Sequence, residues 1–172
     1  FTKSDKSKKN VVLVEYPRKG SWAVGFATKE NDGEISNKVK KIVALSTDKA
    51  SNPINFYGAT KIAGEHMCRS LYHRYKDTDQ HFDYVGLRYM NVYGARQDYH
   101  GAYIAVIMKI LDRLDKGLQP VVYGDGSQAY DFINVVDCGG ANVCAMKADT
   151  TDEFYNVGRG VRTSIKELAE LL

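Results

Sequence analysis

Tyr57 and Lys61 are the two residues of this 172-residue sequence whose types and spacing most directly suggest chemistry. They lie four positions apart in a segment of helical periodicity, so their side chains share one face of a helix. Lowering the pKa of a phenol from about 10 to about 7 requires roughly 4 kcal/mol of selective stabilisation of the phenolate. A nearby ammonium can supply part of that energy. The pair is therefore a candidate base that removes a proton from a hydroxyl group while hydride leaves the same carbon.

Four polar residues precede this helix at the end of an apolar strand: Ser46, Thr47, Asp48 and Lys49. In parallel α/β sheets, ligands bind beyond the carboxyl ends of the strands, so these side chains are placed to face a substrate. We expect Thr47 to hydrogen bond to the reacting oxygen. The spacing also fits an inert arrangement, in which a half-buried tyrosine lies beside a solvated lysine, Asp48 caps a helix and Lys49 is solvated.

The elements that must position these residues alternate between strands and helices. Strand composition is found at residues 39–47, 82–92, 119–124, 130–135 and 153–157, and helical periodicity at 57–75, 102–117, 136–148 and 165–172. Ser164 and Glu167 are spaced as a capping box for the last helix. The alternation predicts an α/β fold with a partial, Rossmann-like, mainly parallel sheet.

The first 38 residues differ from the rest. Residues 11–16 and 21–28 read as two short strands around a turn that contains Pro17 and Gly20, which predicts a β-hairpin. This segment also resembles an uncharacterised family of small, membrane-anchored bacterial proteins, without that family's transmembrane part and with no implied chemistry. We therefore expect a strand-rich segment of uncertain origin at residues 1–38 and an α/β domain at residues 39–172.

Composition and charge exclude several classes of protein. With 44% hydrophobic and 26% charged residues the chain is of globular type, and it contains no run of 18 apolar residues that could span a membrane. The first 41 residues carry ten Lys/Arg against five Asp/Glu, whereas the remaining 131 carry 14 against 16, so no basic domain for nucleic acid is expected. The three cysteines and four histidines form no metal-ligand pattern, which favours a reducing, cytoplasmic location and no metal site.

Several ordered motifs, STDK, YGATK, LRYMNVYG and VVYGDGSQAYDFINVVD, resemble the extended short-chain dehydrogenase/reductase superfamily. The likeness is to its nucleotide-sugar epimerases and 4,6-dehydratases, and it runs from Val39 to Leu172. It implies NAD as cofactor and a UDP-sugar as substrate. It also implies that Tyr57 is the catalytic base, that Lys61 tunes it and holds the nicotinamide ribose, and that Thr47 is the active-site hydroxyl.

The same resemblance implies further roles. Asp48 and Lys49 would transfer protons in a dehydratase, whereas the rest of the chain is closer to epimerases. Ser46 and Tyr89 would lie at the cofactor, and Arg88 would be structural. The residues implied to bind substrate are Asn91, Ala105, Val106, Tyr123 and Tyr130. Tyr130 stands where many relatives have an arginine that clamps phosphate, so another cation such as Arg96 is expected to compensate.

One expected motif is missing from the sequence. The superfamily binds the pyrophosphate of NAD with a glycine-rich GxxGxxG turn, and none of the 15 glycines here has that spacing. Two readings stay open: an NAD-dependent epimerase or dehydratase whose chain is truncated or chimeric, and a non-catalytic fragment with a sugar-nucleotide-binding or assembly role. A homo-oligomer that supplies missing layers is a further expectation.

Overall fold

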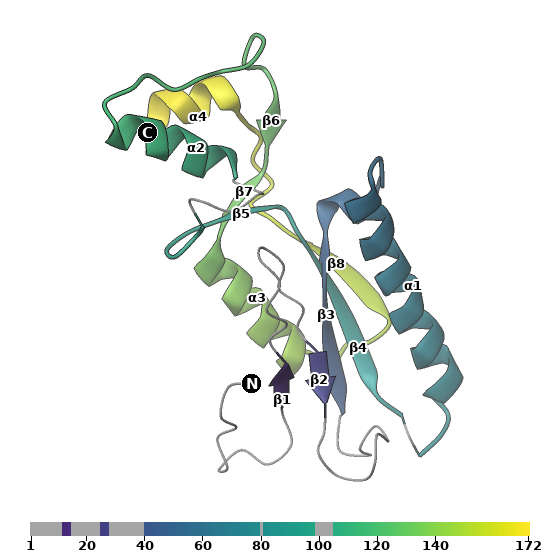
Figure 1. Ribbon diagram of the computed structural model, residues 1–172. Helices are drawn as coiled ribbons and strands as arrows, with labels where there is room; N and C mark the ends of the chain where they lie inside the picture. Colours follow the sequence, from purple (N-terminus) through teal and green to yellow (C-terminus); the bar gives the residue numbers. More distant parts are fainter. Residues whose placement is uncertain (1–11, 15–24, 28–39, 80, 99–104) are drawn as a thin grey trace.

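Three parallel strands form the sheet around which the chain is arranged. In the computed structural model, which describes residues 12–14, 25–27, 40–79, 81–98 and 105–172, their order is β3 (Lys41–Thr47), β4 (Asp83–Tyr89) and β8 (Glu153–Val157) (Figure 1). Thr47 pairs with Tyr89, and Tyr89 with Val157, so the three strands end at one edge. The predicted mainly parallel α/β fold is confirmed, and its carboxyl edge gathers the polar residues that follow β3.

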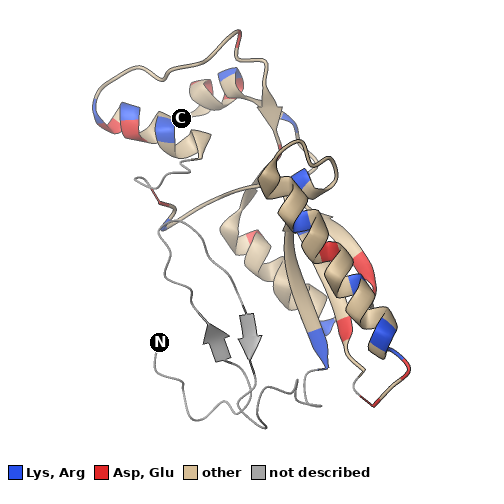
Figure 2. Ribbon diagram, turned by 45° about the vertical axis from the view of Figure 1, so that its right-hand side comes forward, with Lys and Arg blue, Asp and Glu red and all other residues tan. Residues whose placement is uncertain are grey.

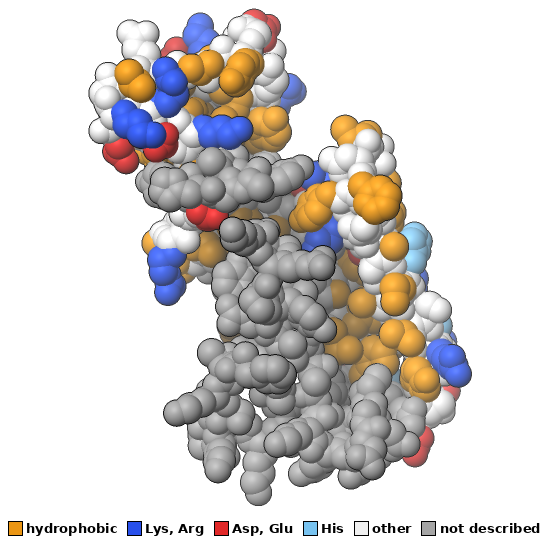
Figure 3. Space-filling view, viewed as in Figure 1, with side chains coloured by type: hydrophobic (Ala, Val, Ile, Leu, Met, Phe, Trp, Pro, Cys, Tyr) orange, Lys and Arg blue, Asp and Glu red, His pale blue; other side chains and the backbone are white. Residues whose placement is uncertain are grey.

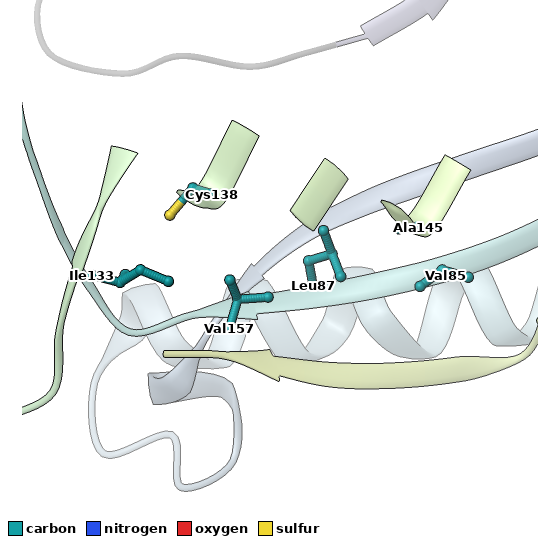
Figure 4. Close-up of a cluster of buried hydrophobic side chains, with 6 residues drawn as sticks. All are labelled: Val85, Leu87, Ile133, Cys138, Ala145 and Val157. Carbon is teal, nitrogen blue, oxygen red and sulfur yellow. The ribbon is translucent and has the colours of Figure 1, made fainter. Parts of the chain in front are cut away.

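Two helices cover opposite faces of this sheet, α1 (Phe56–Tyr75) and α3 (Val135–Lys147) (Figure 1). The side chains between the sheet and α3 form a buried cluster (Figure 4) of Val85, Leu87, Ile133, Cys138, Ala145 and Val157. On the other face, the Phe154 ring packs so closely over Gly86 that an added Cβ would lie 1.9 Å from it. A glycine is therefore required at the centre of β4. We call this part the sheet layer.

A second unit, which we call the helical lobe, stands beyond the carboxyl edge (Figure 1). It contains α2 (Val106–Asp115), α4 (Ile165–Leu171) and the antiparallel pair β6 (Ala129–Tyr130) and β9 (Thr163–Ser164). Its buried side chains form a cluster of their own: Ile107, Met108, Ile110, Ile165 and Leu168. The parallel pair β5 (Asn91–Tyr93) and β7 (Phe132–Asn134) belongs to segments that connect the two units. Each unit thus has a separate hydrophobic core.

Most predicted elements are confirmed, with three differences. Residues 82–92 form two strands, β4 and β5, because the chain changes partners at Met90. The Met90 N–H still donates to the Val157 carbonyl of β8 at 3.0 Å, whereas the Asn91 N–H donates to the Asp131 carbonyl, next to β7, at 2.9 Å. Residues 130–135 divide between β7 and the end of β6. The strand predicted at residues 119–124 is wrong: Pro120 offers no N–H, the following turn has positive φ at Gly124 and Gly126, and the segment lies on the surface of the lobe with Val122 packed against its core.

The predicted capping box is present at the start of α4. The Ser164 hydroxyl accepts from the Glu167 N–H at 3.1 Å, and the Glu167 carboxylate accepts from the Ser164 N–H at 2.8 Å. These bonds satisfy backbone N–H groups that the first helical turn leaves free. They fix the entry of α4 into the helical lobe.

The N-terminal segment contains the two predicted strands, β1 (Val12–Val14) and β2 (Gly25–Ala27), paired antiparallel with Leu13 opposite Phe26. The predicted turn between them, the boundary near residue 38 and the first residues of the helix predicted from residue 102 lie outside the described residues. No helix in the described ranges is long and apolar enough to cross a membrane.

Candidate active site

Polar side chains following β3 form a connected group at the carboxyl edge. Thr47 is buried and caps the short 3-10 helix η1 (Asp48–Ala50), with its hydroxyl donating to the Asp48 carboxylate at 2.8 Å. The same carboxylate oxygen accepts from the Lys49 ammonium at 3.0 Å. Thr47, predicted as the active-site hydroxyl, is thus in contact with Asp48, and Asp48 with Lys49, the two residues predicted to transfer protons in a dehydratase. A hydroxyl, a carboxylate and an ammonium joined by hydrogen bonds can donate or accept protons at adjacent positions.

Tyr57 and Lys61 lie on the same side of α1, as their spacing predicts. The Lys61 ammonium is 5.7 Å from the centre of the Tyr57 ring and also donates to the Leu45 carbonyl at 3.4 Å. The Tyr57 side chain is 49% exposed, so neither group is sealed in the interior. Among the described residues the Tyr57 hydroxyl has no hydrogen-bond partner, which leaves it available to a ligand.

Gly58 brings this helix against the polar group. A Cβ at this position would lie 2.7 Å from the Lys49 carbonyl and 3.0 Å from the Cα of Pro53. The helix start is held by Asn55, whose side chain accepts from the Gly58 N–H at 2.9 Å. Only a residue without a side chain lets the first turn of α1 approach η1 so closely. The YGATK motif therefore has a packing requirement at its second residue.

A buried ion pair between Glu65 and Arg88, which was not predicted from the sequence, lies one helical turn beyond Lys61. Glu65 is 6% exposed and accepts from Arg88 at 2.8 and 2.5 Å and from the Ser46 hydroxyl at 2.5 Å. Burial raises the pKa of Glu65, but the hydrogen bonds from Arg88 and Ser46 outweigh it, so the net pKa lies below its usual value. The structural role expected of Arg88 is confirmed.

The sequence did contain a signal for this pair. A row of polar residues begins at Tyr57 and continues along α1 at four-residue spacing, and its next four members contact the sheet or the residue before β8: Lys61, Glu65, Arg69 and His73. Lower on this row, Arg69 and His73 both contact the Asp152 carboxylate, at 3.0 and 2.9 Å. Continuing the Tyr57–Lys61 spacing along the helix would have found Glu65.

The two remaining residues predicted at the cofactor have protein partners. Ser46 is buried and bonds to Glu65 on the α1 face. Tyr89 lies on the other face, where its hydroxyl accepts from the Asn142 amide at 2.6 Å, and burial raises its pKa. Both lie at or next to the ends of their strands, but their hydroxyls point into the protein. As cofactor contacts they stay predictions.

The predicted substrate residues come together beside the helical lobe. A pocket of about 660 Å³ is lined by Lys49, Asn91, Val106, Tyr123 and Tyr130, which come from three of the sequence motifs and from the helix predicted at residues 102–117. Ala105 caps the start of α2 but does not line the pocket. Arg96, the cation expected to compensate for the missing arginine, also lies outside its lining and has a φ of 68°.

Two cations that the sequence analysis missed line this pocket, Lys109 and Arg113, one turn apart on α2. Figures 2 and 3 show basic residues on this helix and on the visible face of the lobe. The one acidic lining residue, Asp112, is paired with Lys116 at 2.7 Å. Lys49 also lines the pocket but is paired with Asp48, so Lys109 and Arg113 give the lining its positive excess, and Tyr123 and Tyr130 give it aromatic surface. Such a site fits an anion that carries a planar group.

The donor set fits one end of NAD. The unpartnered Tyr57 hydroxyl and the Lys61 ammonium can bond to a ribose at the carboxyl edge. No described strand leads through a glycine-rich turn into a helix, so the described residues offer no cradle for the pyrophosphate. No group of three potential metal ligands occurs in the described ranges, and the three cysteines are free.

Comparisons with known proteins identify the family of the chain. The model of the NAD dependent epimerase/dehydratase family matches residues 33–158, and a model of a protein of unknown function (DUF502) matches residues 1–55. A putative UDP-glucose 4-epimerase of Methanocaldococcus jannaschii is 38% identical over 121 residues, covering 70% of this chain and 37% of that protein. The chain thus spans a little over a third of the length of this curated relative.

Solved structures of epimerases are also similar to this chain. A UDP-N-acetylglucosamine 4-epimerase from Methanobrevibacter ruminantium, in complex with UDP-N-acetylmuramic acid, superposes with a TM-score of 0.67 at 33% identity, covering 77% of this chain and 45% of that one. A UDP-glucose 4-epimerase of Thermotoga maritima with UDP-glucose has a TM-score of 0.67 at 30% identity, covering 78% and 46%. From residue 33 to residue 158, the chain belongs to the NAD dependent epimerase/dehydratase family.

Proposed function

We propose that this chain carries the sugar-nucleotide site and the proton-transfer residues of an NAD-dependent epimerase or dehydratase acting on a UDP-sugar. One observation carries the proposal. Residues predicted from three separate motifs and one helix line a single pocket, and one of them, Lys49, also belongs to the group formed by Thr47 and Asp48. The two solved relatives described above are both UDP-sugar 4-epimerases by name, which supports the substrate class.

Proton transfer is assigned to residues at the carboxyl edge. Tyr57, as the phenolate that the adjacent Lys61 ammonium stabilises, accepts the proton of a sugar hydroxyl and becomes a neutral phenol. The Thr47 hydroxyl hydrogen bonds to the same sugar oxygen and orients it. When bound, NAD supplies the hydride acceptor for the sugar carbon, and its ribose would contact Tyr57 and Lys61.

Asp48 and Lys49 leave the choice between epimerisation and dehydration open. In a dehydratase, Asp48 and Lys49 would transfer protons while water leaves the sugar. Their contact at 3.0 Å supports this assignment, because a paired acid and ammonium can exchange a proton. In an epimerase, Lys49 instead contributes charge to the pocket that it lines.

The pocket is assigned to the nucleotide. Lys109 and Arg113 neutralise the diphosphate in place of the arginine that Tyr130 replaces, and Asn91 donates an amide hydrogen bond. Tyr123, 79% exposed, offers its ring to the base. The positive excess of the lining supports this arrangement.

A second candidate function is a binding or assembly module without catalysis. It is favoured by the sequence, which has no GxxGxxG spacing, and by the described residues, which offer no pyrophosphate cradle. In that case the chain binds the sugar nucleotide but does not turn it over. Self-association through a second copy belongs to the same proposal.

We further propose that residues 1–38 have a separate origin from residues 39–172, in a membrane-anchored family. The DUF502 match, which ends at residue 55 and overlaps the epimerase match, supports two sources of sequence. A cytoplasmic location is proposed on the three free cysteines.

Two titrations of the whole chain test these proposals. Calorimetry with UDP-N-acetylglucosamine should show saturable binding, with free UDP as competitor and GDP as the matched control nucleotide. Thermal shift with NAD then separates the two candidates, since a stabilising shift at micromolar NAD supports the enzyme and no shift at millimolar NAD supports the binding module. If NAD binds, a 4-keto-6-deoxy product identifies a dehydratase and a C4 epimer identifies an epimerase. No binding of the UDP-sugar at millimolar concentration would refute both.

A further inference from the structure

Glu65 is the buried charged residue that the proposed mechanism does not use. It is 6% exposed, and its two carboxylate oxygens are taken by protein donors: Arg88 at 2.8 and 2.5 Å and the Ser46 hydroxyl at 2.5 Å. A buried carboxylate is costly unless it is paired and hydrogen bonded, and here both conditions are met. The question is what this arrangement does beyond satisfying a charge.

Glu65 and its two partners connect the elements of the site. Glu65 is one helical turn after Lys61, Ser46 directly precedes Thr47, and Arg88 directly precedes Tyr89. Ser46 and Arg88 are paired neighbours across β3 and β4. The Glu65 carboxylate therefore joins α1 to the next-to-last residues of β3 and β4, directly before the candidate catalytic residue Thr47.

The rest of this helix face shows why such an anchor is needed at this point. Lys61 reaches β3 only through a long 3.4 Å bond to the Leu45 carbonyl, and Tyr57 is half exposed with no hydroxyl partner among the described residues. Arg69, one turn further on, forms an ion pair with Asp152 near the opposite end of the sheet, and its side chain is half exposed. Of these contacts, the Glu65 contact combines burial, bidentate geometry and nearness to Thr47.

We propose that Glu65 is a positioning residue, which sets the Tyr57–Lys61 pair against Thr47 by fixing α1 to Ser46 and Arg88. The inference rests on the proposed function, because it assigns a purpose to the geometry of that pair. A carboxylate with two oxygens can hold both partners at once, whereas the shorter Asp cannot span the same gap. Because Lys61 and Tyr57 lie about one and two turns before Glu65 on the same helix, fixing α1 at Glu65 also fixes them relative to β3.

The test follows the Tyr57 ring in the whole chain labelled with 3-fluorotyrosine, by ¹⁹F NMR. The Tyr57 signal is identified as the one that Tyr57→Phe removes. In the otherwise unchanged chain, Lys61→Met should shift this signal, because the ammonium lies 5.7 Å from the ring centre. In a Glu65→Gln background the same Lys61→Met substitution should lose most of its effect, because the Lys61 ammonium lies between the Tyr57 ring and the Leu45 carbonyl, and this placement requires α1 to stay fixed against β3. The matched control, Arg69→Met, breaks another ion pair of the same helix and should leave the effect intact.

A second variant separates positioning from stability. Ser46→Ala/Glu65→Met/Arg88→Met replaces the whole buried group by apolar side chains, a change that commonly restores or raises stability. If Glu65 positions the pair, this variant unfolds at the wild-type denaturant concentration or above, yet the Tyr57 signal stays insensitive to Lys61→Met. A stable variant with the full Lys61-dependent shift would overturn the inference. No shift on Lys61→Met in the unchanged chain would instead refute the Tyr57–Lys61 pair, and with it the proposed catalysis.

Discussion

The sheet layer and the helical lobe place polar residues in opposite ways. In the sheet layer, Glu65 is buried and both of its oxygens are bonded by protein partners. In the lobe, Lys109 lines an open pocket and has no ion-pair partner in the part of the chain that the structure describes. A bonded, buried charge holds elements together, whereas an exposed, unpaired charge is available to a ligand. We infer that the sheet layer fixes geometry and the lobe supplies binding.

The strongest test of this contrast replaces one cation in each region. Arg88→Met leaves the Glu65 carboxylate buried without its main partner, so the free energy of unfolding should fall by about 3–5 kcal/mol. Lys109→Met removes an exposed charge and should change it by less than about 0.5 kcal/mol. Urea denaturation of both variants measures the two values. Equal losses would show that the regions do not differ.

The two hydrophobic cores give the next largest effect. Leu87 is 3% exposed in the sheet layer and Ile110 is 2% exposed in the lobe, so either change to Ala should cost about 2–5 kcal/mol. Of these two residues, only Ile110 lies next to the pocket-lining cations. A UDP-sugar should therefore raise the unfolding temperature of the unchanged chain more than that of Ile110→Ala. Thermal shift with and without the nucleotide compares them. The comparison breaks down if Leu87→Ala shows the same loss of ligand stabilisation.

Alkaline pH should weaken the sheet layer through Tyr84. Burial, and then the hydrogen bond to Asp152, raise its pKa from 10.0 to about 12. The fold therefore favours the neutral phenol, so this stabilisation is complete below about pH 10 and is lost as the pH rises towards 12. Tyr84→Phe should flatten the fall of unfolding free energy in that window. Tyr123→Phe, in the exposed wall of the pocket, serves as the control and should leave the fall unchanged.

The affinity for UDP should depend on the cations that line the pocket of the helical lobe. Lys109→Met should weaken UDP binding about tenfold, because a charge-assisted hydrogen bond to phosphate contributes about 1.5 kcal/mol or more. Lys166→Met, on α4 of the same lobe, is the matched control, since Lys166 is exposed and does not line the pocket. Calorimetry gives both dissociation constants. Equal weakening by the two variants would place the phosphate elsewhere.

The smallest expected effect is at the capping box. Ser164→Ala removes the hydroxyl that accepts from the Glu167 N–H, which should cost about 1 kcal/mol. Because α4 packs in the lobe core, the loss should appear in denaturation without a change in the ¹⁹F signal of Tyr57. A shift of that signal would mean that the two regions are not independent.

The sequence predicted the sheet layer better than the lobe. The apolar run of β3 and the long periodic helix α1 are decided by local patterns, and both begin within two residues of their predicted positions. In the lobe, the apolar residues of segment 119–124 suggested a strand, but Pro120 and the glycine turn prevent pairing. The pairing of β6 with β9 joins residues more than 30 positions apart, which no local pattern encodes.

The candidate site divides in the same way. The contacts of Thr47 with Asp48 and of Tyr57 with Lys61 follow from neighbouring positions, so the sequence could indicate them. The bond from Arg88 to Glu65 and the entry of Lys109 into the pocket depend on how α1 and α2 pack, which the sequence did not show. Long-range packing therefore supplies the part of the site that local spacing leaves undetermined.

The central claim is that the pocket beside the lobe binds a UDP-sugar next to the Thr47–Lys49 group. Amide NMR of the ¹⁵N-labelled chain, titrated with UDP-N-acetylglucosamine, tests it most directly. The account predicts saturable shifts concentrated at Lys49, Asn91, Val106, Tyr123 and Tyr130, with little change along the far end of α1. Shifts confined to other residues, or none at millimolar ligand, would contradict it.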